Sequence, residues 1–320
     1  MTLKIVAIAG GVGGAKLAEG LYRVLPANAL TVIVNTADDF EHLGLHISPD
    51  LDTVCYTLAG IANPETGWGR DEETWNALDN ISSLGGPDWF RLGDRDLGMH
   101  LERTRRLHDG QSLSEITAQF CAIWKVNAQV LPMSNHPVAT IVDTYEGELA
   151  FQEYFVARRC EPVVRGFRFE GVQIAAPAPG VLEAIEAADV VVICPSNPWV
   201  SIDPVLAVPG IREAIQTKPT LAVSPIIRGQ TVKGPAAKMF VELGIKPSAE
   251  AVAAHYGRLL SAYVFDRADA EQTKAIEALG IMSHMTDTLM NGPKDRQRLA
   301  GEIIEFVQRV IVETPVKSYL

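Results

Sequence analysis

The sequence predicts an α/β protein with a Rossmann-like, doubly wound and mostly parallel sheet, a smaller helical insertion and an antiparallel hairpin region. Two observations support this prediction. Apolar runs alternate with stretches of helical spacing, and one long segment between them has helical patterns only. Unbroken apolar runs are typical of strands that are buried on both faces of a parallel sheet. The strand-like runs span residues 3–9, 30–35, 189–194 and 219–223.

The first predicted strand ends in a glycine-rich turn that leads into a helix. Without Cβ atoms, the backbone N–H groups of this turn can approach an anion closely. Lys16 stands where the dinucleotide fingerprint needs a small residue, and Leu17 follows it where the P-loop needs Ser or Thr. The turn therefore predicts a phosphate or nucleotide ligand whose identity stays open, and a turn that binds nothing is the alternative. Its glycines are Gly10, Gly11, Gly13 and Gly14.

The composition indicates a globular protein with a small ligand. The chain has 320 residues, is 47% hydrophobic and carries a formal net charge of -11, which disfavours binding to nucleic acid. No apolar run approaches the roughly 20 residues needed to cross a bilayer, and no cleavage site follows the N-terminal apolar segment. We therefore expect a cytoplasmic protein without membrane contact. Four scattered cysteines without a C-x-x-C pair indicate neither disulfides nor a zinc site.

The loop after the second predicted strand is rich in carboxylates. Residues 36–60 read TADDFEHLGLHISPDLDTVCYTLAG and should lie at the carboxyl ends of the strands, beside the glycine turn. Acidic groups next to a phosphate are favourable when a divalent cation lies between them, and Mg²⁺ takes one or two carboxylates with phosphate oxygens. The alternative is that Asp50 or Asp52 caps the following helix. The acidic residues are Asp38, Asp39, Glu41, Asp50 and Asp52, interleaved with His42 and His46.

The pattern divides the chain into a core and an insertion. Residues 64–126 contain three amphipathic helical patterns without a convincing strand, which predicts a helical insertion. Residues 1–63 and 127–320 are the expected Rossmann-like core with the nucleotide or phosphate site. Within the core, residues 138–175 alternate polar and apolar side chains as antiparallel strands do, with Glu146 and Gly147 as the predicted hairpin turn.

A cluster of aromatic, arginine and aspartate residues follows at 87–107. Aromatic faces combined with guanidinium groups suit a planar ring with polar edges. The alternative is that the aromatic residues belong to the core and that the aspartates cap the next helix. The cluster contains Trp89, Phe90, Arg91, Asp94, Arg95 and Asp96.

Polar side chains also follow the two later predicted strands. Ser196, Asn197 and Ser201 come after the strand that ends near residue 194, where short polar groups can read a base edge or a ribose. Arg228 and Lys233 follow the next strand and could balance phosphate charge. A solvated basic turn is the alternative for this last segment.

Six ordered segments of the chain closely resemble the 2-phospho-L-lactate transferase family. The likeness is dense over residues 4–245 and looser beyond them. The segments read AGGVGGAKLAEGL, NTADDFEHLGLHISPDLDTVCYTLAG, GWGRDEETWNAL, DWFRLGDRDLGMHLERTRRL, PSNPWVSIDPVLAVPGIR and SPIIRGQTVKGPA. The resemblance implies a Rossmann-like fold and a role in coenzyme F-420 biosynthesis. The family transfers a phospho-acid from a guanosine diphosphate-activated three-carbon acid to the ribityl hydroxyl of the deazaflavin Fo and releases GMP.

The resemblance also implies roles for single residues. The donor and its phosphates would be bound by Gly10, Gly11, Val12, Gly13, Gly14, Lys16, Arg228 and Lys233, with Ser196, Asn197 and Ser201 on the guanosine side. Asp38, Asp39, Asp50 and Asp52 would be catalytic, and Asp39, Asp50 and Asp52 would be the Mg²⁺ ligands. The deazaflavin would contact Asn35, His46, Trp89, Arg91, Asp94, Arg95 and Asp96.

Two further expectations concern the acidic loop. The family often has glycine where this chain has Ala37, which alters the local backbone but keeps the two acids that follow. If Asp50 and Asp52 ligate metal, asparagine at either position should lower activity steeply and change stability little. Which acid binds metal and which accepts the hydroxyl proton stays open.

The implied partners are small molecules. They are Fo and a guanylylated 2-phospholactate, phosphoenolpyruvate or phosphoglycerate, and the enzyme would depend on the guanylyltransferase that makes this donor. The sequence leaves a homodimer open. A nucleotide-sugar-binding regulator of the gluconeogenesis factor type is the alternative, although the tryptophan-rich residues 66–96 and the acidic loop argue against it. Lys16 disfavours an NAD-dependent dehydrogenase.

Overall fold

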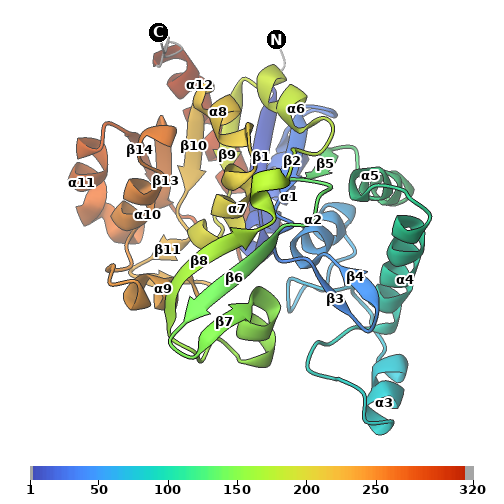
Figure 1. The fold of residues 1–320 in the computed structure, drawn as a ribbon. Helices are drawn as coiled ribbons and strands as arrows, with labels where there is room; N and C mark the ends of the chain where they lie inside the picture. Colours follow the sequence, from blue (N-terminus) through green and yellow to red (C-terminus); the bar gives the residue numbers. More distant parts are fainter. Residues whose placement is uncertain (1–2, 314–320) are drawn as a thin grey trace.

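The computed structural model describes residues 3–313 and has a central sheet of seven strands in the order β14-β13-β10-β9-β1-β2-β5 (Figure 1). All neighbouring strands in this sheet are parallel. The predicted fold class is therefore confirmed. The strands expected from the apolar runs are β1 (Ile5–Ala9), β2 (Leu30–Val34), β9 (Val190–Ile193) and β10 (Thr220–Val223).

Strand β1 lies in the middle of the sheet and is buried on both faces, as its unbroken apolar run predicts. Ile5, Ala7 and Ala9 belong to one hydrophobic cluster, while Val6 and Ile8 belong to the other. The neighbours of β1 are β2 on one side and β9 on the other. Because these strands are parallel, the segments that follow them meet at the same edge of the sheet.

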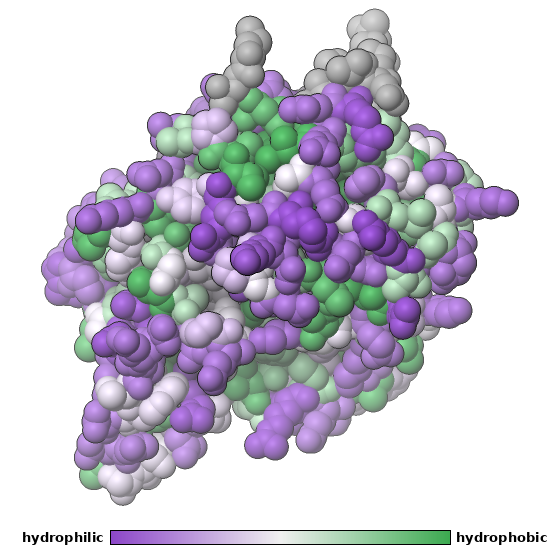
Figure 2. Space-filling model, turned by 180° about the vertical axis from the view of Figure 1, so that it is seen from behind, coloured by the Kyte–Doolittle hydropathy of each residue, from purple (hydrophilic) through white to green (hydrophobic). Residues whose placement is uncertain are grey.

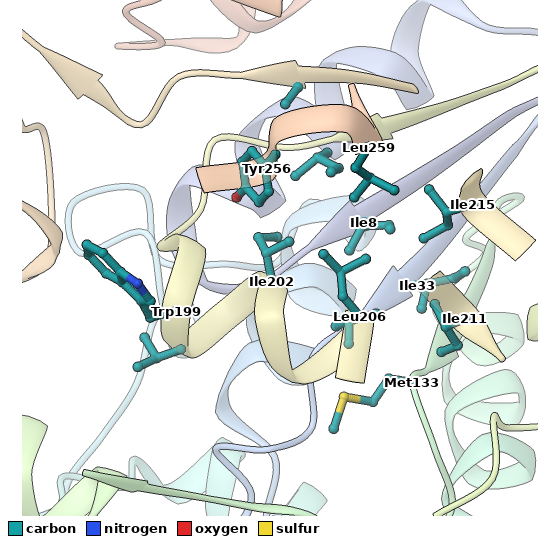
Figure 3. Packing of buried hydrophobic residues seen from close by; sticks show 14 of the residues in the cluster. Ile8, Ile33, Met133, Trp199, Ile202, Leu206, Ile211, Ile215, Tyr256 and Leu259 are labelled. Atoms are coloured by element: carbon teal, nitrogen blue, oxygen red, sulfur yellow. The ribbon is translucent and has the colours of Figure 1, made fainter. Parts of the chain in front are cut away.

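Helices cover both faces of the sheet. On one face, the cluster around Leu17 and Val54 includes side chains of α1 (Gly11–Val24), α2 (Pro49–Ala59) and α12 (Pro293–Glu313). On the other face, Ile8 and Ile33 of the sheet pack near Ile202, Leu206 and Ile211 (Figure 3). The helices on this second face are α6 (Val181–Ala187), α7 (Asp203–Ala207), α8 (Ile211–Gln216), α9 (Ala236–Glu242), α10 (Ala249–Tyr256) and α11 (Thr273–Ala278).

Residues 64–126 hold α3 (Asn76–Ser83), α4 (Asp94–His108) and α5 (Leu113–Ile123). Figure 1 shows α3 and α4 at one side of the molecule, away from the central sheet. A small hydrophobic cluster of Tyr56, Met99, Ile116 and Phe120 joins α4 and α5 to α2. The division into a core and an insertion stays a prediction.

Antiparallel pairing occurs in three smaller sheets. The region 138–175 contains β6 (Ala139–Thr144), β7 (Gly147–Ala150) and β8 (Val164–Glu170), which pair antiparallel. Because Thr144 pairs with Gly147, the hairpin turn is Tyr145–Glu146, one residue earlier than predicted. The other two sheets are β3 (Phe40–His42) with β4 (Leu45–Ile47), inside the acidic loop, and β11 (Ile226–Ile227) with β12 (Gln230–Thr231).

The remaining elements complete the sheet and its connections. They are β5 (Gln129–Pro132), β13 (Ala262–Asp266), β14 (Met282–Thr286) and the short helices η1 (Glu153–Ala157), η2 (Val172–Ile174), η3 (Pro198–Ile202), η4 (Gly257–Leu259) and η5 (Arg267–Gln272). Figure 2 shows the side of the molecule that faces away from the viewer in Figure 1. Its surface is mostly hydrophilic, and the hydrophobic residues lie in separate areas. Within residues 3–313, no helix has both the length and the apolar character that a membrane span requires.

Candidate active site

A cavity of about 660 Å³ lies where the segments after β1, β2, β9 and β10 meet. Residues between 53 and 100, the segment between β7 and β8, and residues 288–291 complete its wall. Fifteen of the predicted site residues line the cavity: Gly10, Gly11, Val12, Gly13, Lys16, Asp38, Asp50, Asp52, Trp89, Arg91, Asp96, Ser196, Asn197, Ser201 and Lys233. The predicted residues outside its lining are Gly14, Asn35, Asp39, His46, Asp94, Arg95 and Arg228.

The glycine turn packs tightly against the segment that follows β9. A Cβ atom at Gly13 would lie 2.3 Å from the carbonyl oxygen of Pro195, and one at Gly14 would lie 2.7 Å from the Ser196 hydroxyl oxygen. The Ser196 hydroxyl donates to the carbonyl oxygen of Gly10 at 2.8 Å. The glycines therefore allow the segments after β1 and β9 to pack closely, and they also leave the backbone of the turn accessible to a ligand.

Asp50 is bound directly to the glycine turn. Its Oδ1 accepts the backbone N–H of Gly11 at 2.7 Å, and its Oδ2 accepts from Nδ2 of Asn35 at 3.0 Å. Helix α2 begins at Pro49 after Ser48, so Asp50 lies in its first turn and is not the N-cap residue. Burial raises the pKa of Asp50 to about 6, against the opposing effect of its two hydrogen bonds.

Asn35 supports Asp50 from behind the cavity wall. Besides Asp50, its side-chain amide donates to the carbonyl oxygen of Val200 at 3.2 Å, and its Oδ1 accepts from the backbone of Ala37 at 3.0 Å. The side chain is fully buried. Asn35 therefore links the end of β2 to the segment after β9 and fixes the carboxylate of Asp50 between them.

The adjacent acids Asp38 and Asp39 differ in their surroundings. Asp38 lines the cavity, and its Oδ1 has no hydrogen-bond partner among the described residues. Burial, followed by the charges of Asp50 and Asp39, raises the pKa of Asp38 well above its usual range. Asp39 instead accepts from the Ser48 hydroxyl at 2.7 Å and lies 3.2 Å from Nε2 of His46. His46 thus belongs to the support of Asp39.

Asp52 forms a buried ion pair. Nη1 of Arg103 donates to its Oδ2 at 3.0 Å, and Nη2 donates to its Oδ1. Nδ1 of His100 lies 3.8 Å from Asp52, and burial lowers the pKa of His100 to about 4. The sequence analysis missed Arg103 and His100. Their signal was the spacing of Asp96, His100 and Arg103, which places all three on one face of a helix.

Aromatic side chains line another part of the cavity. The Trp89 ring lies 5.7 Å from that of Phe90 and 6.0 Å from that of Phe40. In the same wall, burial raises the pKa of Asp96 to about 7. The buried hydroxyl oxygen of Tyr56 has no hydrogen-bond partner in the described part of the chain. This region therefore combines apolar faces with buried polar groups.

Three predicted residues outside the cavity lining make local contacts. Asp94 accepts from the Thr74 hydroxyl at 2.6 Å and from the backbone of Ala77 at 3.0 Å, so it stabilises the start of α3. The side chain of Arg95 donates to the carbonyl oxygen of Asp71 at 3.2 Å. The backbone N–H of Arg228 donates to the Asp269 carboxylate at 3.0 Å. Ligand contacts of Asp94, Arg95 and Arg228 stay predictions.

Two lysines give the cavity a cationic region beside the glycine turn. Nζ of Lys16 donates to the carbonyl oxygen of Met290 at 2.9 Å, and Nζ of Lys233 donates to that of Thr66 at 2.5 Å. Burial lowers the pKa of Lys16, and the charges of Arg296 and Lys233 lower it further. Within residues 3–313, neither lysine forms a salt bridge with a carboxylate. Both ammonium groups are therefore available to an anion.

The carboxylates allow a test of the expected Mg²⁺ site. Among the described residues, no group of three His, Cys, Asp or Glu side chains is arranged to hold a metal ion. Mg²⁺ needs only one or two carboxylates when phosphate oxygens and water complete its octahedron. Asp38 and Asp50 both line the cavity and would be the residues that hold such an ion, with Asp50 oriented by its hydrogen bonds from Gly11 and Asn35. Asp39 lies outside the cavity lining, and both oxygens of Asp52 are paired with the buried guanidinium group of Arg103.

The chain is similar to known proteins over most of its length. The family described as "2-phospho-L-lactate transferase CofD" matches residues 5–289. A phosphoenolpyruvate transferase of Streptomyces griseus is 42% identical over 316 residues, which cover 96% of this chain and 99% of that protein. A 2-phospho-L-lactate transferase of Methanosarcina mazei is 39% identical over 301 residues, which cover 94% of this chain and 99% of that protein.

A solved structure supports the fold alone. A UPF0052 family member from Bacillus halodurans superposes with a TM-score of 0.62 at 19% identity, over 95% of this chain and 100% of that chain. The match to the family spans the whole cavity lining apart from two residues, Met290 and Asn291. The chain therefore belongs to the 2-phospho-L-lactate transferase CofD family of transferases.

Proposed function

We propose that the protein transfers a phospho-three-carbon-acid from its guanosine diphosphate-activated form to the ribityl hydroxyl of Fo and releases GMP, a step of coenzyme F-420 biosynthesis. One observation carries this proposal. A single cavity joins a cationic region at the glycine turn to an aromatic region around Trp89, and Asp38 and Asp50 also line it. The donor and the acceptor would therefore meet beside these two carboxylates.

The donor would occupy the region of the glycine turn. Lys16 and Lys233 offset the charge of its diphosphate, and Ser196, Asn197 and Ser201 line the same cavity on the guanosine side. The names of the relatives, phosphoenolpyruvate transferase and 2-phospho-L-lactate transferase, support a three-carbon phospho-acid. They leave open which of 2-phospholactate, phosphoenolpyruvate and phosphoglycerate this chain prefers.

The acceptor would bind with its planar ring against the aromatic wall. Trp89 and Phe90 present ring faces, while Arg91 and Asp96 line the same part of the cavity and can meet polar ring edges. Arg91 itself lies over the ring of Trp75 at 4.3 Å, which fixes its guanidinium group. The ribityl chain would then extend toward Asp38 and Asp50.

The reaction is a displacement at phosphorus. The ribityl oxygen forms a bond to the phosphorus that carries the three-carbon acid, the bond from that phosphorus to the GMP phosphate breaks, and GMP leaves. One carboxylate of the Asp38 and Asp50 pair accepts the hydroxyl proton. A Mg²⁺ ion held by this pair would neutralise phosphate charge.

The proposed reaction also needs a second enzyme. A guanylyltransferase must supply the activated donor, since nothing in the reaction makes it. We propose a cytoplasmic enzyme that acts on small molecules, with Mg²⁺ as its cofactor, and a homodimer is compatible with it.

Competition among donors tests the proposal. The protein is incubated with Fo, Mg²⁺ and an equal mixture of the three guanylylated acids. The deazaflavin products are then identified and quantified by mass spectrometry. We expect one phosphodiester product to dominate, because a pocket built to bond a hydroxyl rejects donors without it. No product with any donor would refute the transferase. Equal amounts of all three products would show that the pocket does not select its donor.

Binding measurements separate the remaining functions. We expect Fo to quench the tryptophan fluorescence of the protein and GDP to bind, whereas NADH should not bind. A nucleotide-sugar-binding regulator would have no use for a deazaflavin. Binding of GDP without any binding of Fo would therefore favour the regulator.

A further inference from the structure

Residues 61–71 form a loop, here called the flap, that is closed at its base. The backbone N–H of Asp71 donates to the carbonyl oxygen of Ile61 at 2.9 Å, and that of Asn63 donates to Gly69 at 3.0 Å. The flap is also bonded internally. The backbone N–H of Gly67 donates to the carbonyl oxygen of Asn63 at 2.9 Å, and the Thr66 hydroxyl donates to that of Trp68 at 2.6 Å. The flap therefore behaves as one unit about its base.

The tip of the flap rests on the glycine turn. Gly67 has φ +75°, and a Cβ atom there would lie 2.7 Å from Cγ1 of Val12. Only glycine allows this approach without strain. Trp68 and Gly69 follow directly and line the cavity, and the side chain of Trp68 is 46% exposed. Because Trp68 is part of the flap, its position in the cavity wall depends on the position of the flap.

Lys233 also contacts the tip of the flap. Its Nζ donates to the carbonyl oxygen of Thr66 at 2.5 Å, across 167 positions of sequence. An ammonium group has three protons, so Lys233 can bind this carbonyl and an anion at once. The charge of Lys16 acts on that of Lys233, and the hydrogen bond to Thr66 is exposed to solvent, so on its own it stabilises the contact only weakly.

We propose that Lys233 is a positioning residue that bridges a bound diphosphate to the flap, so that the donor fixes Trp68 before the acceptor binds. This inference rests on the proposed function for the identity of the donor. An anion on the glycine turn cancels the repulsion between the two lysines and holds Lys233 against Thr66. The flap then stays on Val12, and Trp68 completes the wall on which a planar acceptor lies.

Pyrophosphate tests the bridge without any turnover. The protein is grown with fluorotryptophan, and the Trp68 signal in the fluorine NMR spectrum is assigned with Trp68→Phe. We expect saturating pyrophosphate to shift or sharpen this signal in the wild type and in the control Lys246→Met, whose lysine is exposed and outside the cavity lining. In Lys233→Met the signal should stay unchanged, and pyrophosphate should bind roughly tenfold more weakly after loss of one charged hydrogen bond.

A second variant changes the contact between the flap and Val12 without changing the charges of Lys16 and Lys233. Gly67→Ala places a Cβ against Val12 and should lift the tip, so the Trp68 signal should differ from wild type before pyrophosphate is added. Lys16 and Lys233 are intact in this variant, so pyrophosphate should still bind. The bridge is overturned when pyrophosphate binds to the wild type without affecting Trp68, or affects Trp68 equally in Lys233→Met. Neither outcome depends on Fo, so failure of the transferase would be seen separately.

Discussion

Asp50 and Asp52 are two positions apart in the sequence but have different partners. Asp50 is hydrogen-bonded to the glycine turn and to Asn35, whereas Asp52 forms a buried ion pair with Arg103. The sequence analysis gave both the same expected effect on mutation. For Asp50 this expectation stays a prediction. For Asp52 we now expect a loss of stability as well, because an ion pair with a buried arginine cannot lose its charge without cost.

Asparagine substitutions distinguish the two positions. Asp50→Asn should cost only about 1 kcal/mol of stability, for one lost hydrogen bond, and should lower the rate of transfer at least about 100-fold. Asp52→Asn should cost about 3–5 kcal/mol, because it leaves the Arg103 charge buried and unpaired. Urea unfolding and the transfer assay on both variants check this. Equal stability of the two variants would contradict the assignment.

Asp96 gives the protein a pH-dependent stability. Burial raises its pKa from 3.8 to about 7, so the folded protein keeps a proton there that the unfolded chain has released. Between these two pKa values the folded state binds more protons, and the stability therefore falls as pH rises. Asp96→Asn removes this effect. From pH 5 to pH 8, the free energy of unfolding of the variant should gain about 3 kcal/mol relative to wild type.

Urea unfolding of both proteins at the two pH values measures that change. Gly98→Ala is a matched control in the same helix, because it changes no titratable group and its site is open. A constant difference between wild type and Asp96→Asn at both pH values would show that Asp96 titrates normally.

At the scale of elements, the joint between α1 and the segment after β9 has no room for a side chain. Gly13→Ala would place a methyl group 2.3 Å from the Pro195 carbonyl oxygen, and backbone atoms cannot move aside as a flexible side chain can. We expect a loss of about 1–3 kcal/mol and a displaced Ser196. Gly301→Ala is the matched control, since its site in α12 is open. Thermal unfolding compares the two, and equal melting temperatures would contradict the tight joint.

The elements differ in how well the sequence predicts them. The strands β1, β2, β9 and β10 were predictable because each is a continuous apolar run that is buried on both faces. The strand β13 was missed because the apolar residues of α10 and η4 run almost directly into it, so periodicity alone does not separate this strand from the preceding helical segment. The hairpin of β3 and β4 was missed because each strand has only three residues and lies inside the acidic loop.

At the scale of the molecule, the cavity is assembled from segments that are far apart in sequence. Parallel strand order explains why the turns after β1, β9 and β10 meet, and the sequence analysis predicted this much. It could not predict which face of α4 points inward. The orientation of α4 puts His100 in the cavity wall and pairs Arg103 with Asp52. This orientation depends on the packing of α4 and α5 against α2.

The central claim is that one cavity brings the guanylylated donor and Fo together for direct transfer. The release of GMP in a single turnover, with protein in excess over donor and Mg²⁺ present, tests it most directly. We predict that GMP and the deazaflavin phosphodiester appear together in equal amounts and only when Fo is present, and that Asp50→Asn suppresses both. Release of GMP without Fo would indicate a hydrolase, and release of GDP would indicate attack at a different bond. Either result would contradict the account.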